Sequence, residues 1–316
     1  MTEPDTITRE AGSPGTRAER PRPITLSHRL EFAGYIAIRA LMRALPFKLA
    51  SDMMAWLWQL IAPRMHRHER ALKHLRLAYP EKTDAEREAI AHAMWGHLGR
   101  TMAESFVIDR IAASADMISF AIPPDVQKFI DEKRPMILAG LHLGNWELAA
   151  VGGSQNDLKI DLAGVYQRIL NPLVDRSIRN ARAPYYSAGL YTKGHDTVKT
   201  LMRLMRQGKC IGIVSDLRDN RGLPVPFFGQ VANSSPFPAM LSVLYDAPIV
   251  AVQCVRLTPS SFRIELETVV ATDGANRDET IAARTAALHA VFERFIRRNP
   301  EQWMWAHRRW DIERRY

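Results

Sequence analysis

The sequence predicts an α/β fold with a mainly parallel central sheet flanked by helices. Two observations predict it. Short apolar runs typical of buried strands alternate with helical stretches over residues 135–300, which is the pattern of a sheet covered on both faces. The composition agrees, because 47% hydrophobic and 24% charged residues in a chain of 316 are ordinary for a globular protein with a sizeable core.

Residues 1–24 are rich in proline, glycine and arginine and contain no apolar run. They predict a disordered tail and show no sign of a signal peptide. Residues 25–66 are different, because apolar stretches dominate them, and Pro46 should divide them into two helices. Residues 67–316 are expected to form the main domain.

The character of the two N-terminal helices leaves two interpretations open. The uncharged run 53–63 has 11 residues, whereas a spanning helix needs about 20. Trp56 and Trp58, followed by several arginines, favour helices that lie in the membrane interface. The alternative is a pair of core helices in a soluble domain.

The remaining elements follow from hydrophobic periodicity, capping residues and breakers. Asp84 is a plausible helix N-cap, Asn171-Pro172 starts another helix, and Gly208 and Asn299-Pro300 end helices. Helices are expected at 84–111, 145–153, 171–182, 197–208 and 279–300, and strands at 135–142, 159–167, 209–216, 247–257 and 262–270.

The strongest chemical signal is His142-Leu-Gly-Asn-Trp-Glu147, which comes directly after the strand at 135–141. Reactive groups in α/β sheets collect at the carboxyl ends of strands. On one regular helix, residues five apart would point away from each other, so the pair needs a turn, which Gly144 permits. Asn145 can cap the next helix. His142 and Glu147 then form a candidate general-base pair, with Glu147 fixing the imidazole tautomer. The alternative is a core histidine and a helix-capping glutamate.

A second charged segment, Ser215–Gly222, follows the strand at 209–216. An arginine such as Arg218 can bind phosphate or carboxylate in a bidentate way, and Asp216 and Asp219 stand beside it. The alternative is a solvated charged turn. The apolar loop 223–229 that follows contains Phe227 and Phe228, which either line an acyl pocket or pack into the core.

Two further segments carry candidate binding residues. Arg168 follows the strand at 159–167 and is the best single candidate for holding an anion, and Asn171 near it either binds substrate or caps a helix. The C-terminal segment 302–310 is aromatic and basic. It fits base stacking with nucleic acid, a membrane-surface strip and ordinary packing.

Charge and missing motifs narrow the function classes. The charges of residues 1–24 cancel, so the net charge of +9 lies on the rest of the chain and suggests an anionic partner. With two cysteines, Cys210 and Cys254, each in an apolar run, neither a disulfide framework nor a cysteine-based zinc site is expected. The motifs of serine hydrolases, P-loop NTPases, dinucleotide enzymes and zinc proteases do not occur. No metal or cofactor is therefore expected.

At the His142–Glu147 segment the sequence resembles the bacterial lipid A late acyltransferases, whose wider family includes the phosphatidylinositol mannoside acyltransferases. The resemblance covers about residues 26–310 and rests on the order and spacing of several stretches. They are RALKHLRLAYPE (70–81), GRTMAES (99–105), AGLHLGNWELA (139–149), the Tyr166–Asn171 block, SDLRDNRG with VPFFG (215–229), and PEQWMWAHRRW (300–310).

The resemblance implies a glycerolipid-acyltransferase-like fold in which His142 and Glu147 form the catalytic dyad. It implies that Arg168 and the Asp216–Asp219 turn border the active cleft. It also implies an acyl thioester on acyl carrier protein as donor and a hydroxyl of a phosphorylated glycolipid, the lipid A precursor, as acceptor. The helices at 25–66 would attach the enzyme to the cytoplasmic face of the inner membrane, with no nucleic acid involved.

Two departures from the family pattern bear on the acceptor. His74-Leu75 stands where relatives often have asparagine-leucine, and the charged turn is Asp216-Leu-Arg-Asp219 where many lipid A enzymes have Asp-Gln-Asp. They leave the exact acceptor and the subfamily open, so one alternative is an acyltransferase for another membrane glycolipid or aminolipid. Two separate alternatives are a nucleic-acid-binding protein that uses the basic C-terminus and a non-catalytic membrane scaffold.

Overall fold

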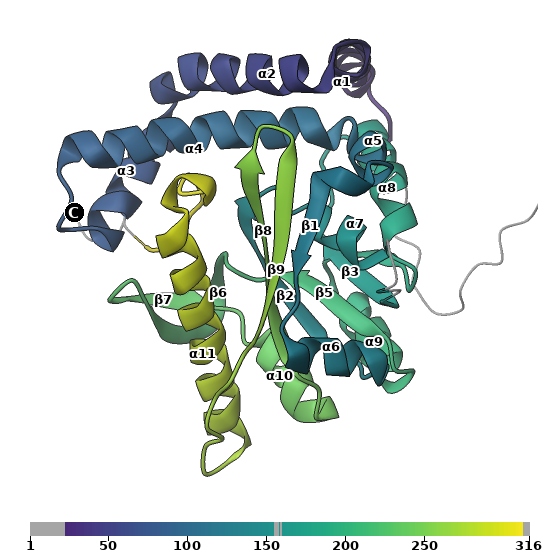
Figure 1. The fold of residues 1–316 in the computed structure, drawn as a ribbon, viewed down its shortest axis with the longest axis vertical. Coiled ribbons are helices and arrows are strands. Elements are labelled where there is room, and N and C mark those ends of the chain that lie inside the picture. The colour runs from purple at the N-terminus through teal and green to yellow at the C-terminus, as the bar shows by residue number, and fades with distance from the viewer. Residues whose placement is uncertain (1–22, 155–157, 159, 312–316) are drawn as a thin grey trace, which may run out of the picture.

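A seven-stranded sheet forms the centre of the part of the chain described by the computed structural model, which is residues 23–154, 158 and 160–311 (Figure 1). The strand order is β1-β9-β8-β2-β5-β3-β4, and neighbouring strands are parallel except β8 and β9. A separate antiparallel hairpin consists of β6 and β7. The strands are β1 Ile118–Ala121, β2 Ile137–Gly144, β3 Leu162–Tyr166, β4 Leu190–Thr192, β5 Cys210–Val214, β6 Arg218–Phe227, β7 Gln230–Ser234, β8 Ile249–Thr258 and β9 Ser261–Thr268.

Helices surround this sheet, and α2 and α4 run across one end of it (Figure 1). The helices are α1 Leu26–Ala44, α2 Phe47–Ile61, α3 His66–Ala78, α4 Asp84–Ser105, α5 Ile108–Ala112, α6 Pro124–Asp131, α7 Leu148–Ser154, α8 Pro172–Arg182, α9 His195–Arg206, α10 Phe237–Tyr245 and α11 Arg277–Arg298. The predicted α/β class with a mainly parallel sheet is confirmed.

Strand β8 shows why the sheet must be covered on both faces. Its side chains from Ile249 to Val255 are all buried, which is typical of a parallel sheet between two layers of helices. Ile249 and Ala251 join the core beneath α11, whereas Val250 and Val252 join the core beneath α7. Because strand side chains alternate between faces, one run of small apolar residues serves both cores.

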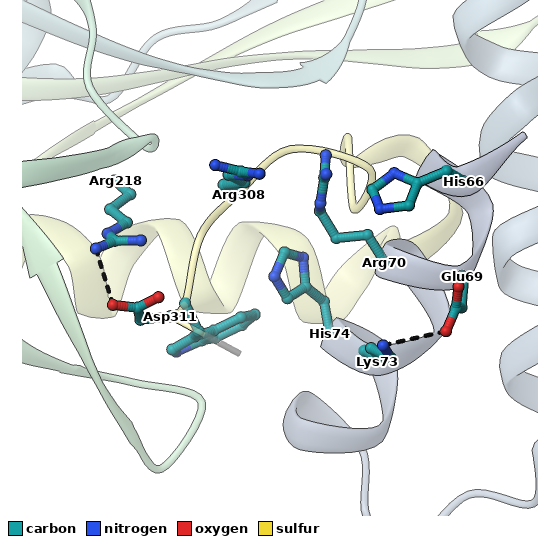
Figure 2. A pocket seen from close by; sticks show the side chains of 9 residues that line it. His66, Glu69, Arg70, Lys73, His74, Arg218, Arg308 and Asp311 are labelled. Atoms are coloured by element: carbon teal, nitrogen blue, oxygen red, sulfur yellow. Dashed lines mark hydrogen bonds and ion pairs between the residues drawn. The ribbon is translucent and has the colours of Figure 1, made fainter. Parts of the chain in front are cut away.

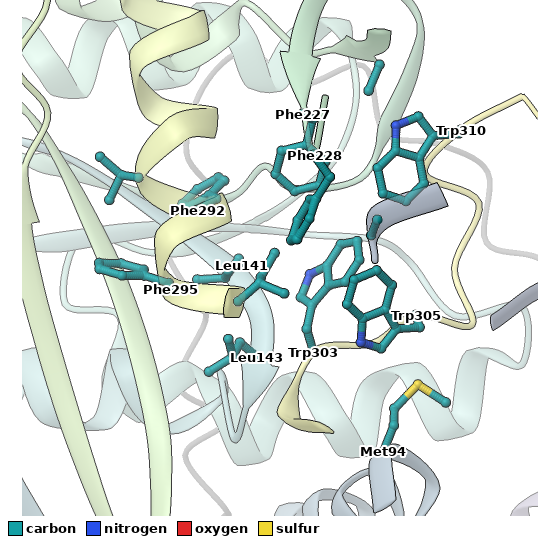
Figure 3. Close-up of a cluster of buried hydrophobic side chains, with 14 of the residues drawn as sticks. Met94, Leu141, Leu143, Phe227, Phe228, Phe292, Phe295, Trp303, Trp305 and Trp310 are labelled. Atoms are coloured by element: carbon teal, nitrogen blue, oxygen red, sulfur yellow. The ribbon is translucent and has the colours of Figure 1, made fainter. Parts of the chain in front are cut away.

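The largest core contains a cluster of aromatic rings (Figure 3). Phe227 and Phe228, at the tip of the β6–β7 hairpin, pack against Trp303, Trp305 and Trp310 and are almost fully buried. The two phenylalanines are therefore core residues, the second of the two predicted roles. The C-terminal tryptophans are core residues too, so neither base stacking nor a membrane-surface strip describes them. Such rings dominate the energetics of a core because each buries a large apolar area.

Helices α1 and α2 have two contrasting faces. Met42, Ala50 and Met54 are buried against α4. Large apolar side chains on the other faces are exposed, among them Leu30 at 67% and Trp56 at 62%. Among the described residues, no helix combines the length and hydropathy needed to cross a membrane. The predicted tail, residues 1–24, lies outside the described residues except for its last two.

Several predicted boundaries are confirmed. Pro46 separates α1 from α2, Asn171 caps α8 by accepting from the backbone N of Leu173 and Val174, and Gly208 follows α9 with a φ of 77°. Asn299 and Pro300 end α11 as predicted.

Other expectations for secondary structure were wrong. The helix expected over 84–111 is α4 followed by the separate α5, and its N-cap is Thr83, which forms a capping box with Glu86. The charged turn and apolar loop expected over 215–229 are mostly the hairpin strand β6. Strands β1, β4 and β7 and helices α3, α6 and α10 were not expected.

Candidate active site

His142 lies near the carboxyl end of β2, next to the parallel strand β5, and Asp216 lies just beyond the end of β5. The parallel register therefore brings the two side chains together. The backbone N of His142 donates to Asp216 Oδ2 over 2.9 Å, and His142 Nδ1 donates to Asp216 Oδ1 over 2.8 Å. Because Nδ1 carries the proton in this pair, the neutral imidazole keeps its lone pair on Nε2. His142 is thus set up as a base at Nε2.

Asp216 is completely buried, and its environment keeps it ionised. Burial acts to raise the pKa of its carboxyl group. The charge that His142 carries when protonated, the two hydrogen bonds from His142 and one from Trp303 Nε1 over 2.8 Å outweigh burial, so the pKa lies well below its ordinary value. An ionised Asp216 stabilises the imidazolium that forms when His142 takes up a proton.

Glu147 lies in the turn between β2 and α7, where it forms an ion pair with Arg182 at the end of α8. The expectation that Glu147 accepts the hydrogen bond that fixes the imidazole tautomer is wrong, because Asp216 accepts it. Among the described residues, no hydrogen bond or ion pair joins Glu147 to His142. The sequence placed Asp216 near the cleft but gave it a different partner, an arginine.

Two rings flank the His142 imidazole. The Trp146 ring meets it edge-on at 4.9 Å between centroids, and the His307 ring lies 5.5 Å away. Burial, together with the charge that His142 carries when protonated, lowers the pKa of His307 to about 4, so His307 is neutral at pH 7. His307 and Trp303 come from the C-terminal segment, which the sequence analysis singled out without giving it a place at the site.

The backbone of the C-terminal segment is also bound to β2. The backbone N of Met304 donates to the carbonyl of His142 over 3.1 Å, and Leu143 pairs with Trp303 in an isolated antiparallel bridge. His142 is therefore held from two sides, by Asp216 after β5 and by residues 303–304. Fixed geometry of this kind favours catalysis because little reorganisation is needed during the reaction.

The turn after His142 is fixed by a buried polar network. Gly144 has a φ of +58°, and a Cβ there would lie 2.0 Å from the carbonyl oxygen of Cys254, so only glycine fits. Thr101 Oγ1 donates to the Gly144 carbonyl over 3.0 Å. Asn145 Nδ2 donates to Glu104 Oε2 over 2.8 Å, and the buried Arg256 donates to the same carboxylate. The predicted cap by the Asn145 side chain is therefore replaced by a hydrogen bond to α4.

An apolar cavity of about 250 Å³ lies between α1, α4, α5 and α8. Glu147 and Arg182 supply charged groups to a wall that is otherwise mostly apolar. The remaining lining residues are Tyr35, Met102, Ser105, Phe106, Ile108, Val174, Ile178 and Ala181. A largely apolar pocket with a few polar groups is typical of a ligand site. Met240 and Leu244 on α10 do not line this cavity and are exposed.

The other predicted binding residues occupy different places. Arg168 is exposed in the segment after β3. Asn171 is 5% exposed, and its amide donates to the His28 carbonyl and to Glu31 Oε2 while its oxygen caps α8. These hydrogen bonds connect α1 with α8. Asn171 is therefore a helix cap, the second of its two predicted roles.

Arg218 and Asp219 lie at the start of β6. Arg218 Nη2 donates to Asp311 Oδ2 over 3.1 Å, and Asp219 Oδ1 accepts from the backbone N of Arg221 over 3.0 Å. The structure therefore joins Asp216 to His142, places Arg218 two residues further along, and uses Asp219 in a local turn.

The comparison with protein families agrees with this geometry. The family model described as bacterial lipid A biosynthesis acyltransferase matches residues 22–311, nearly the whole chain. The chain belongs to this family. A search of curated proteins finds no match. For a lipid A acyltransferase, the buried carboxylate–histidine pair at a strand end and the apolar cavity are the features on which a mechanism can be built.

Proposed function

We propose that this acyltransferase moves a fatty acyl chain from an acyl thioester on acyl carrier protein to a hydroxyl of a lipid A precursor. The observation that carries the proposal is the hydrogen bond from His142 Nδ1 to the buried Asp216, because it leaves the Nε2 lone pair available to a substrate hydroxyl. The family match supports an acyltransferase of lipid A biosynthesis and suggests a lipid acceptor.

In the proposed reaction, His142 Nε2 removes the proton of the acceptor hydroxyl as its oxygen attacks the thioester carbonyl carbon. The tetrahedral intermediate then expels the thiolate, which receives the proton from the imidazolium. Asp216 stabilises the imidazolium, as the carboxylate does in a Ser-His-Asp triad. The acceptor attacks directly, so no acyl group is bound to the protein during the cycle.

The apolar cavity suits the acyl chain of the donor. Its charged end is the Glu147–Arg182 pair, and Glu147 lies five residues along the chain from His142. The other lining side chains are mostly apolar. In this arrangement the chain lies among residues of α1, α4 and α8, and the thioester lies near Arg182. The guanidinium is then placed to stabilise charge on the carbonyl oxygen, and Glu147 holds the guanidinium in position. The role of Arg168 as a second cation that binds an anionic group of the substrate remains a prediction.

Helices α1 and α2 suit attachment to the cytoplasmic face of the inner membrane. Leu26, Leu30 and Leu41 on α1 and Trp56 and Leu60 on α2 are exposed, and α2 lies on the side of α4 away from the sheet (Figure 1). Apolar side chains of this kind bind the headgroup region of a bilayer. In this placement the acyl cavity, which α1 helps to line, lies close to the lipid surface.

The transfer is tested with purified protein, lauroyl- or myristoyl-acyl carrier protein and a lipid A precursor, and mass spectrometry of the lipid product. The expected product carries one additional acyl chain and appears only with donor, acceptor and active enzyme. An acylated protein intermediate would contradict direct transfer. An unchanged lipid A precursor beside an acylated second glycolipid or aminolipid would move the acceptor to that lipid.

A further inference from the structure

Helix α8 has two faces with different surroundings. One face lines the apolar cavity, through Val174, Ile178, Ala181 and Arg182. The spacing of these residues is that of neighbours on one side of a helix. Arg176 and Arg179 fall on the opposite side, and both are exposed. A single helix therefore lies between the cavity and a charged surface.

The exposed face of α8 carries positive charge. Among the described residues, no ion pair or side-chain hydrogen bond involves Arg176 or Arg179. The one acid in the sequence of this helix, Asp175, faces the end of β3 instead. Its carboxylate accepts from the backbone N of Ile169 over 2.9 Å and from the Tyr166 hydroxyl over 3.2 Å. The two arginines are thus available to an anionic partner, and their planar donors match a carboxylate.

Neighbouring segments add cations to the same region. Residues 166–193 contain five lysines and arginines and one acid. Lys193 is exposed just beyond β4, and its backbone N donates to the Tyr166 carbonyl over 2.9 Å. Burial raises the pKa of Tyr166, whereas the charges of Arg179 and Arg168 act in the opposite direction, so both arginines lie near this tyrosine. Together, the cations of this region form the α8 basic surface, which consists of Arg168, Arg176, Arg179 and Lys193.

The α8 basic surface lies near the proposed reaction centre. His142 and Lys193 lie at the carboxyl ends of β2 and β4, and these ends belong to one edge of the sheet because β2, β5, β3 and β4 are parallel. On α8, Arg182 pairs with Glu147. At 1.5 Å per residue, Arg179 lies about 5 Å from Arg182 along the helix axis. A partner bound to Arg179 therefore stands beside the end of the cavity where the thioester is proposed to lie.

A second group of cations differs from this surface. Figure 2 shows a pocket between α3 and the C-terminal segment, where Lys73 pairs with Glu69 and Arg218 pairs with Asp311, each over 3.1 Å. A partner bound at that pocket would compete with both acids. Arg176 and Arg179 have no such competitor in the described part of the chain.

The side chains on the exposed face favour a protein over a bilayer as partner. Helices α1 and α2 expose large apolar side chains such as Leu30 and Trp56, which suits a lipid surface. Leu170, which precedes α8, is exposed too, but no large apolar residue within α8 is exposed. A charged surface of this kind suits acidic side chains of another protein, because complementary charges guide association and fix orientation.

We propose that the α8 basic surface docks an acidic protein, and that this protein is the acyl carrier protein that delivers the acyl chain. Acidic side chains of the carrier pair with Arg176, Arg179 and Lys193, and the acyl chain enters the cavity on the other side of α8. The identity of the partner rests on the proposed function, whereas the charge of the surface does not.

The first test measures docking without any transfer reaction. Fluorescently labelled holo-acyl carrier protein is titrated with the full-length protein, and fluorescence anisotropy gives Kd at low and at high salt. Binding should weaken as the salt concentration rises, because exposed charges are screened. Arg176→Glu/Arg179→Glu should raise Kd by about tenfold or more, since it places like charges opposite each other. No binding of the wild type at low salt, or an unchanged Kd for the folded variant, would overturn the inference.

The matched control is Arg203→Glu/Arg206→Glu on α9. These two arginines are also exposed and three residues apart, but they lie in the last turn of α9, which leads to the amino end of β5. The control therefore makes the same change of net charge near the opposite edge of the sheet, and it should bind the carrier as the wild type does. Equal weakening by both variants would assign the effect to net charge, and the inference would fail.

Anionic vesicles test the other class of partner. Cosedimentation with phosphatidylglycerol vesicles should be the same for the wild type and for Arg176→Glu/Arg179→Glu. A variant that lost vesicle binding and kept the wild-type Kd for the carrier would place the α8 basic surface against the bilayer, which contradicts the inference.

The second test connects docking with turnover. The KM of Arg176→Glu/Arg179→Glu is measured separately for the acyl carrier protein thioester and for the lipid A precursor. We expect a rise confined to the thioester. A rise confined to the lipid would place the acceptor on α8 and overturn the inference. Transfer with an unchanged KM for the thioester would refute the docking site and leave the proposed function standing. Carrier docking that depends on α8, in a protein that transfers no acyl chain, would refute the proposed function and leave the docking site standing.

Discussion

Asp216 accepts two hydrogen bonds from His142, one from the backbone N and one from the imidazole Nδ1. The first fixes the carboxylate against β2, and the second fixes the ring against the carboxylate. Since Asp216 also accepts from Trp303 Nε1, one buried side chain connects the ends of β2 and β5 with the C-terminal segment. The position of the His142 ring is therefore tied to Asp216.

Replacement of Asp216 by asparagine should leave the fold in place and abolish most activity. The amide can donate to Nδ1, which would move the imidazole proton to Nε2 and remove the base. By comparison with the equivalent change in a serine protease triad, kcat should fall on the order of 10⁴-fold. Asp219→Asn is the control, because Asp219 accepts a local backbone hydrogen bond from Arg221 and does not contact His142 in the described part of the chain. Activity of Asp216→Asn close to that of the control would show that Asp216 does not orient the histidine.

Replacement of Glu104 by glutamine should shift the turn that follows His142 and lower the free energy of unfolding. The change leaves the Arg256 charge buried without its partner, and such a loss costs about 3–5 kcal/mol of unfolding free energy. Urea unfolding measures this cost. Ser51→Ala is the matched control, since Ser51 donates to Glu104 Oε1 from α2 and does not reach the turn. It should cost about 1 kcal/mol.

Asn145→Ala distinguishes the effect of the turn after His142 from that of the Glu104–Arg256 ion pair. It removes the hydrogen bond to Glu104 and leaves Arg256 paired. We expect kcat to fall while the KM for the thioester changes little, because the variant shifts the turn between His142 and Glu147. Unchanged kcat with lowered stability would mean that the network supports the fold and does not position the site.

Stability should fall as the pH falls below about 6.5. Burial lowers the pKa of His74, His289 and His307 from 6.5 to about 4. Between these values the unfolded chain binds protons that the folded chain does not, so each histidine removes up to about 1.4 kcal/mol of stability per pH unit. Urea unfolding at pH 7 and pH 5 measures the loss. His289→Gln should make it smaller, whereas replacement of His195, which is exposed on α9, should not.

Acyl-chain preference should change when the cavity is made smaller. Ala181→Leu adds three carbon atoms to the wall next to Arg182, so shorter donors should be favoured. A methylene in an apolar pocket is worth about 1–3 kcal/mol, which corresponds to a selectivity change of about 10-fold or more. Competition between donors of different length, analysed by mass spectrometry, gives the ratio. An unchanged ratio would place the acyl chain elsewhere.

The sequence predicted those parts of the fold that depend on local rules. Pro46, Asn171 and Gly208 act on their immediate neighbours, and each ends or starts a helix where expected. Strands β1 and β4 were missed because they are only four and three residues long and are stabilised by pairing with distant strands. The hairpin β6–β7 was missed because its charged first half resembles a solvated turn.

In the candidate site, too, the sequence indicated what local rules decide and missed what depends on contacts between distant segments. His142 could be found because it follows an apolar strand and precedes a glycine that permits a turn. Its partner could not be assigned correctly, since Glu147 is near in sequence whereas Asp216 is 74 residues away and is brought close only by the pairing of β2 with β5. His307 and Trp303 lie in an aromatic segment whose buried side chains look, in the sequence, like a surface for membrane or nucleic acid.

The central claim is that His142 is the general base of an acyl transfer to lipid A. The most direct measurement is mass spectrometry of lipid A from a deletion strain that carries either the wild-type chain or His142→Ala, with equal amounts of folded protein verified. The wild type should restore one acyl chain, and His142→Ala should not, since loss of a general base slows transfer about 10²–10⁴-fold. Full restoration of that acyl chain by His142→Ala would contradict the account.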